Sequence, residues 1–137
     1  MIDKYGKYLS FLFLINMLQL TKENITNSIS KNMPGIYCIK NKQNNKYYIG
    51  QSIDMRGRLL YHINKSKIAK YQHIHRAINK NGLENFEFCI LMIVDKQNDV
   101  KNTLDFFEKY YIKKFNSYGK CGYNETIGGD IGVLGFK

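Results

Sequence analysis

The sequence predicts one small domain of mixed α and β structure, and three observations support this prediction. A chain of 137 residues with 44% hydrophobic content can bury one core but is too short for two comfortable domains. Two short β-branched and aromatic runs flank an Asn-rich connection, which predicts a β-hairpin over residues 35–50. The residues that follow include stretches in which apolar residues have helical spacing, and one continuous apolar run. Helices and at least one further strand are therefore expected.

The hairpin is bounded by glycines, Gly35 at the start of the first run and Gly50 at the end of the second. Glycine has no Cβ, so another part of the chain can approach closely at either position. Each run also carries a tyrosine, Tyr37 and Tyr48. On the hairpin alone, a core element is favoured over a site that presents two tyrosines to a phosphodiester.

Two helices and a strand are predicted next. Ser52 or Asp54 can cap a helix over 54–66, which places Arg58 and His62 one turn apart on one face. A second helix is expected over 71–81, because Asn81-Gly82 is a typical helix end. The run 86–94 begins by alternating and becomes continuously apolar, which is typical of a strand covered on both faces.

A late helix over 99–116 is predicted from an apolar stripe, and Glu108 lies at the margin of that stripe. An unpaired carboxylate is costly to bury, so Glu108 needs a partner. Spacing leaves two alternatives open, an ion pair with an arginine of the first helix or a role as a ligand of Mg²⁺. The stripe consists of Leu104, Phe107, Tyr111 and Phe115.

The charge is concentrated in the middle of the chain. The whole chain has a net charge of +10, and residues 35–80 carry ten Lys and Arg residues but one acidic residue. A concentrated basic patch attracts polyanions, so nucleic acid is the leading partner, ahead of an acidic membrane surface. A solvated helix face without a partner is the third alternative.

The three cysteines are far apart and form no metal-ligand spacing, which argues against a zinc finger or a disulfide framework. Reduced thiols in an intracellular setting fit best. The apolar run 8–20 is shorter than the roughly 20 residues that cross a bilayer, so stable membrane insertion is not expected. Residues 1–32 are interpreted as an apolar leader followed by a polar linker, and 131–137 as a Gly-rich tail.

Together these positions resemble the GIY-YIG nuclease family, most closely its intron-encoded homing endonucleases. The resemblance covers residues 33–130, and its elements occur in order with compatible gaps. It implies an α+β fold with a small, three-stranded, mostly antiparallel sheet flanked by helices. The elements are Gly35-Ile36-Tyr37, Tyr48-Ile49-Gly50, Arg58, His62, Glu108 and Gly122-Tyr123-Asn124.

The resemblance implies hydrolysis of DNA phosphodiester bonds with one divalent ion, Mg²⁺ or Mn²⁺, and no small-molecule cofactor. Glu108 matches the metal-binding glutamate of the family. Arg58 matches the arginine that neutralises the scissile phosphate. Asn124 matches an asparagine that helps to hold the site together.

Tyr37 and Tyr48 match the paired tyrosines, one of which is proposed to orient or deprotonate the attacking water. His62 matches a histidine that assists the base or contacts phosphate. Arg58, His62 and the ion would favour the phenolate form of a nearby tyrosine. The hydroxyls of both tyrosines, the guanidinium of Arg58 and the carboxylate of Glu108 are expected to converge on one pocket.

Double-stranded DNA is the expected partner, bound by a monomer or a transient dimer. Two alternatives stay open, a degenerate domain that only binds nucleic acid and a nuclease of the restriction or repair type. Intracellular action is expected, in an organelle such as the mitochondrion or in the cytoplasm of a phage or viral host. The expected DNA-binding residues are Lys46, Lys65, Lys67, Lys70, Arg76 and Lys80.

Overall fold

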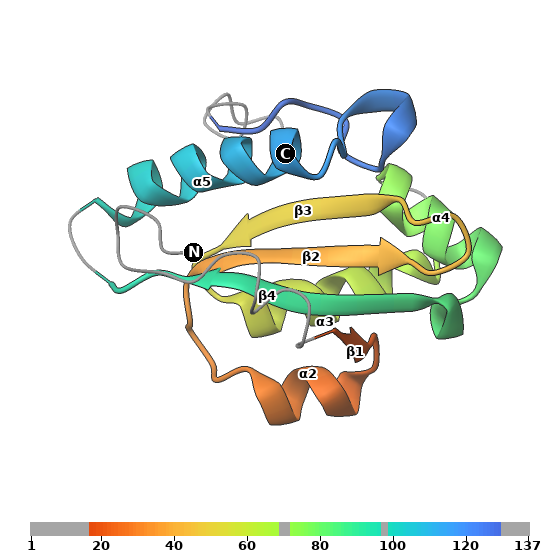
Figure 1. Cartoon of the computed structure of the whole chain (residues 1–137). Helices are drawn as coiled ribbons and strands as arrows, with labels where there is room; N and C mark the ends of the chain where they lie inside the picture. The colour runs from red at the N-terminus through yellow and green to blue at the C-terminus, as the bar shows by residue number, and fades with distance from the viewer. Residues whose placement is uncertain (1–16, 69–71, 97–98, 130–137) are drawn as a thin grey trace.

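The computed structural model describes residues 17–68, 72–96 and 99–129. Within them a four-stranded antiparallel sheet, in the order β1-β4-β2-β3, lies between helices (Figure 1). The strands are β1 (Leu18–Gln19), β2 (Gly35–Asn41), β3 (Tyr47–Ser52) and β4 (Phe86–Ile93). The helices are α2 (Lys22–Ser28), α3 (Met55–Ser66), α4 (His73–Asn81) and α5 (Val100–Lys114), with short 3₁₀ turns η1 (Leu83–Asn85) and η2 (Gly119–Cys121).

The sheet separates two apolar clusters, so each of its faces is covered. One cluster joins Ile39 and Phe88 of the sheet to α2, α3 and α4, and includes Leu59 and Ile78. The other joins the opposite face to α5. Because α5 lies across the sheet from α3, the β3 edge is flanked by both (Figure 1).

The predicted hairpin is confirmed, with Tyr37 of β2 opposite Gly50 of β3. Its glycines are required by close approach, as expected. A Cβ on Gly35 would overlap the carbonyl oxygen of Met92, and a Cβ on Gly50 would overlap the phenol of Tyr37. Any larger residue at position 50 would therefore displace the tyrosine that packs across it.

The helices predicted after the hairpin are confirmed within two residues at their ends. Asp54 is the N-cap of α3, and its side chain accepts a hydrogen bond from Gly57 N. Gly82 follows α4 with a positive φ of 93°, a conformation that glycine adopts at low cost. The strand predicted over 86–94 is also confirmed, and it lies between β1 and β2.

The N-terminal segment differs from the prediction of a polar linker over 21–34. Thr21 caps α2, and Ile25 and Ile29 are buried against the core. Ile25 lies within α2, whereas Ile29 is its C-cap in an extended conformation, so this short helix has no apolar stripe that the sequence could reveal. Just before this helix, β1 adds a fourth strand to the three expected, by pairing Leu18 with Phe88.

Three segments of the chain carry predictions that lie outside the described residues. They are residues 8–16 of the apolar run, Lys70, and the tail 131–137. Within the described residues, no helix has the length and apolar character needed to cross a membrane.

Candidate active site

A polar pocket of about 290 Å³ is lined by residues of β3, α3 and α5. It brings together four of the six predicted catalytic residues: Tyr48, Arg58, Glu108 and Asn124. The other two, Tyr37 and His62, are fully buried and do not line it. The expectation that both tyrosines face one pocket is therefore met by Tyr48 and not by Tyr37.

Tyr37 belongs to a buried chain of three polar side chains. Its hydroxyl lies 2.7 Å from Nε2 of His62, and Nδ1 of His62 lies 2.8 Å from Nε2 of His75. The other nitrogen of His75 is buried without a hydrogen-bond partner among the described residues. These three hydrogen-bonded side chains thus link β2 to α3 and α4 behind the pocket wall that Tyr48 forms.

Burial determines the protonation states of Tyr37, His62 and His75. It lowers the pKa of His62 well below the usual value, with further lowering by Arg58 and His75. It also lowers the pKa of His75 to about 4, and Arg58 contributes. Burial raises the pKa of Tyr37 well above 10. At neutral pH all three groups are therefore uncharged.

Tyr48 is half-buried at the pocket wall, and burial raises its pKa to about 12. Arg58 lowers that pKa, which is the effect expected from the sequence, but burial outweighs it. Arg58 therefore favours the phenolate as predicted, but burial keeps Tyr48 protonated. At neutral pH Tyr48 presents an O–H group to the pocket.

Arg58 projects from α3 and is braced by an aromatic ring. Its Cζ lies 4.4 Å from the centroid of the Tyr61 ring, a cation–π contact one helical turn along. No ion pair joins it to Glu108 among the described residues. Of the two alternatives for Glu108, the ion pair with an arginine of the first helix is therefore not supported.

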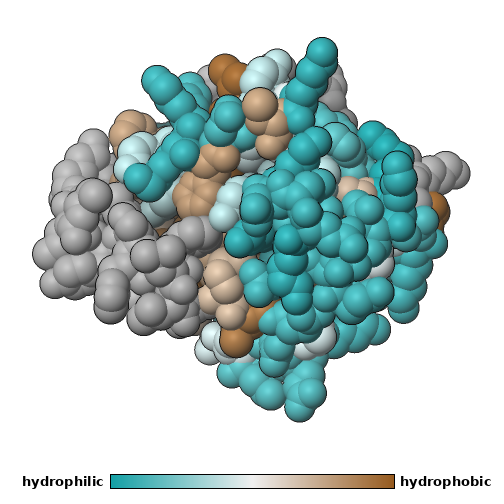
Figure 2. All heavy atoms as spheres, turned by 45° about the vertical axis from the view of Figure 1, so that its right-hand side comes forward, coloured by the Kyte–Doolittle hydropathy of each residue, from teal (hydrophilic) through white to brown (hydrophobic). Residues whose placement is uncertain are grey.

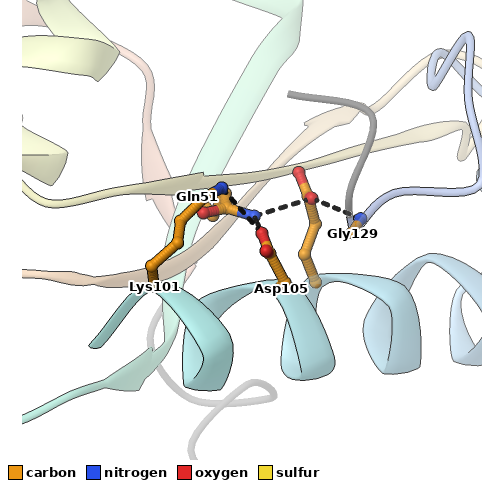
Figure 3. Close-up of polar contacts among 5 residues, drawn as sticks. Gln51, Lys101, Asp105 and Gly129 are labelled. Carbon is orange, nitrogen blue, oxygen red and sulfur yellow. Dashed lines mark hydrogen bonds and ion pairs between the residues drawn. The ribbon is translucent and has the colours of Figure 1, made fainter. Parts of the chain in front are cut away.

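Glu108 projects from α5 and is held through one oxygen. Its Oε1 accepts hydrogen bonds from Gln51 Nε2 at 2.9 Å and from Gly129 N at 3.1 Å (Figure 3). Burial raises the pKa of Glu108, and the bonds from Gln51 and Gly129 oppose that rise. Oε2 has no hydrogen-bond partner within the described residues.

The donors of the pocket determine which ion it could hold. Within the described residues, three or more His, Cys, Asp or Glu side chains nowhere gather to hold an ion. Glu108 therefore offers one carboxylate in a polar pocket, which leaves the other positions to water and substrate oxygens. That donor set fits Mg²⁺, which keeps several waters and binds one or two carboxylates.

Asn124 is buried and uses its whole amide to hold the edge of the sheet. Its Oδ1 accepts from Ile49 N at 2.8 Å and from Ser117 Oγ at 2.6 Å. Its Nδ2 donates to Ile49 O at 2.8 Å. Asn124 therefore replaces a neighbouring strand at β3 and anchors the loop that carries Gly129.

The predicted basic residues that the structure describes lie on α3, on α4 and just before β3. Arg76 Nη2 lies 3.7 Å from Oε2 of Glu125, which itself lines the pocket. Lys67 and Lys80 are exposed at the ends of the two helices. Hydrophilic side chains cover much of the face in Figure 2, on the side where α4 lies in Figure 1.

Sequence reasoning missed five residues of the site and its surroundings. The pair of Asp105 and Glu108 on one face of a helix was a detectable signal, because i, i+3 residues are neighbours. The contact between His62 and His75 was not detectable, because it joins two helices whose packing the sequence does not specify. The five residues are Gln51, Tyr61, His75, Lys101 and Asp105.

Comparison with known proteins agrees with this geometry. A model of the GIY-YIG catalytic domain matches residues 33–124. A mutant of the catalytic domain of the intron endonuclease I-TevI is 31% identical, with a TM-score of 0.60, over 70% of this chain and 96% of that one. The catalytic domain of the homing endonuclease I-TevI is 33% identical, with a TM-score of 0.58, over 68% and 98%. The chain therefore belongs to the GIY-YIG nuclease family.

Proposed function

We propose that this GIY-YIG nuclease is an endonuclease that hydrolyses DNA phosphodiester bonds with a divalent ion, Mg²⁺ or Mn²⁺. The observation that carries the proposal is the meeting of three groups at one pocket. They are the carboxylate of Glu108, the guanidinium of Arg58 and the hydroxyl of Tyr48. Together they supply an ion ligand, a positive charge and a hydrogen-bond donor, the groups that phosphodiester hydrolysis requires.

Each side chain has a part in the reaction. Arg58 binds the non-bridging oxygens of the scissile phosphate, where negative charge increases in the transition state. Tyr48 is neutral at pH 7 and orients the attacking water. A divalent ion on Glu108 would add positive charge at the phosphate and increase the acidity of a bound water. Overall, the water oxygen bonds to phosphorus and loses a proton, while the departing oxygen gains one.

The biological setting belongs to the same proposal. Similarity to a domain described as an intron and homing endonuclease supports an intron-encoded homing role. The exposed basic residues on α3 and α4 would bind the phosphates of double-stranded DNA. One site per domain means that two strands are cut by sequential nicking or by a transient dimer. Three free cysteines support action inside a cell, where thiols stay reduced, in an organelle or in the cytoplasm of a phage or viral host.

Nicking of supercoiled plasmid with and without Mg²⁺ tests the proposal. We expect metal-dependent nicking by the wild type and a loss of at least about 100-fold in Glu108→Ala, as when another charge-stabilising group is removed from an active site. Glu23→Ala is the matched control, because Glu23 lies on α2, across the sheet from α5. A wild type that binds DNA but does not cut it with any divalent ion would instead identify a degenerate binding domain.

A further inference from the structure

The carboxylate of Glu108 is attached to the sheet by one glutamine. Gln51 Nε2 donates to Glu108 Oε1 at 2.9 Å and also to Asp105 Oδ1 at 2.8 Å. Figure 3 shows Lys101 and Asp105 extending from α5 toward Gln51 of β3. Because Asp105 and Glu108 are three residues apart, they share one face of α5 and both reach the same amide.

The orientation of this amide is determined by its partners. Both acceptors are carboxylate oxygens, so the NH₂ group of Gln51 must face them. Turning the amide over would place its carbonyl oxygen against two carboxylates. Asp105 is in turn held by Lys101, whose Nζ lies 2.8 Å from Oδ1. Donor groups of Gln51 and Lys101 therefore hold the carboxylates of Asp105 and Glu108 near each other despite their mutual repulsion.

A second donor completes the attachment of Glu108. Gly129 N donates to the same oxygen, Oε1, at 3.1 Å. Gly129 has a positive φ of 77°, and an added Cβ would lie 3.0 Å from Cε of Lys109, so the loop reaches this place most readily with glycine. Two N–H donors occupy Oε1, while Oε2 has no partner among the described residues.

From this arrangement we infer that Gln51 is a positioning residue, which makes Glu108 a single-oxygen ligand that offers Oε2 to the ion. Asp105 fixes the direction of the Gln51 amide. The inference rests on the proposed function, because it concerns the ion that Glu108 would bind.

The test measures Mn²⁺ affinity without DNA, from the electron paramagnetic resonance signal of free Mn²⁺. Gln51→Met keeps the length of the side chain and removes both N–H donors. We expect it to weaken Mn²⁺ binding by about 10- to 100-fold, the usual effect of removing a group that orients a metal ligand. Gln43→Met, in the exposed β2–β3 turn at the far end of the hairpin, is the matched control and should bind as the wild type does.

Two further measurements separate positioning from general damage. DNA affinity in EDTA and the melting temperature should stay near those of the wild type. Asp105→Leu should weaken Mn²⁺ binding as well, whereas Asp105→Asn, which keeps an acceptor oxygen for Gln51, should restore most of it.

The outcomes distinguish this inference from the function on which it rests. If Glu108→Gln abolishes Mn²⁺ binding and Gln51→Met leaves it unchanged, the positioning role is wrong and the proposed metal site stands. If Glu108→Gln binds Mn²⁺ as tightly as the wild type, the proposed metal site itself is wrong. If Gln51→Met also lowers metal-free DNA binding and the melting temperature, Gln51 has a general structural role. Should Gln51→Met not fold, the comparison of Asp105→Leu with Asp105→Asn decides the same question.

Discussion

The two tyrosines of the hairpin have different surroundings, although both match positions of the family motif. Tyr48 lines the pocket, whereas Tyr37 lies behind it with no exposed surface and bonds to His62. A side chain that cannot be reached by water or substrate acts on the reaction through its neighbours. At the scale of single residues, we therefore expect the hydroxyl of Tyr48 to take part in the proposed reaction and the hydroxyl of Tyr37 to hold the wall of the site.

Removing each hydroxyl should have a different effect. Tyr48→Phe should lower nicking by about 100-fold, because a group that donates to the reacting atoms is lost, with little change in stability. Tyr37→Phe leaves Nε2 of His62 buried and unpaired, which should lower the free energy of unfolding by about 1–3 kcal/mol. Urea denaturation and plasmid nicking on both variants make the comparison.

Tyr37→Phe also tests whether the buried tyrosine takes the proton of the attacking water. If it cuts as fast as the wild type, that role is excluded. If nicking falls as far as in Tyr48→Phe while stability is unchanged, the buried hydroxyl takes part directly, and the division of roles between the two tyrosines is wrong.

At the scale of elements, α3 and α4 are joined by a buried pair of imidazoles, His62 and His75. Burial lowers the pKa of both below the ordinary value of 6.5, in His75 to about 4. A group with a lowered folded-state pKa stabilises the fold above its unfolded pKa, and this contribution is lost as pH falls. The relevant window therefore runs from 6.5 down toward 4.

We expect the free energy of unfolding to decrease across this window by about 1.4 kcal/mol per pH unit for each imidazole that gains a proton on unfolding. His75→Gln removes one titrating group, so its stability should depend less steeply on pH, whatever its stability at pH 7. Urea denaturation between pH 7 and pH 4 gives the slopes, and equal slopes in the wild type and His75→Gln would show that this imidazole does not titrate on unfolding.

Elements with strong local signals were predictable from the sequence. The hairpin, α3, α4, β4 and α5 were each predicted within two residues, because turn, capping and periodicity signals agreed there. The helix α2 was not, because its composition is polar and Ile25 is its one buried residue. A two-residue strand such as β1 has no local pattern at all, and its pairing with β4 depends on the tertiary fold.

The residues of the site were likewise predictable where the signal was local, and not where it depended on the tertiary fold. Motif spacing indicated Arg58, Glu108 and Tyr48, and the structure brings them to one pocket. Motif spacing could not indicate that Tyr37 is buried, because that depends on the strand order, which places β2 inside the sheet and β3 at its edge. Gln51 was missed for a similar reason, because its partners come from a helix more than fifty residues later.

At the scale of the whole molecule, the pocket holds charges of both signs, whereas other basic residues lie outside it. Glu108, Glu125, Arg58 and Lys101 line the pocket, and Asp105 bonds to Gln51 of its wall. The exposed basic residues of the chain's middle third include Lys67 at the end of α3, Arg76 and Lys80 of α4, and Lys42 in the β2–β3 turn. We expect DNA to be held on the α3–α4 side while its backbone enters the pocket, where a divalent ion would offset the negative charge of both partners.

This arrangement predicts which lysines contribute to the salt dependence of DNA binding. The logarithm of the affinity falls with the logarithm of salt concentration, by a slope of about 0.9 for each phosphate contacted. The double variant Lys67→Ala with Lys80→Ala, at the ends of α3 and α4, should therefore reduce the slope by about 2 between roughly 50 and 200 mM salt. Lys113→Ala with Lys114→Ala removes the same charge from the exposed end of α5, across the sheet, and should leave the slope nearly unchanged. Fluorescence anisotropy of labelled duplex DNA in EDTA measures the slope of both double variants without cleavage. An equal reduction of the slope in the two would contradict binding on the α3–α4 side.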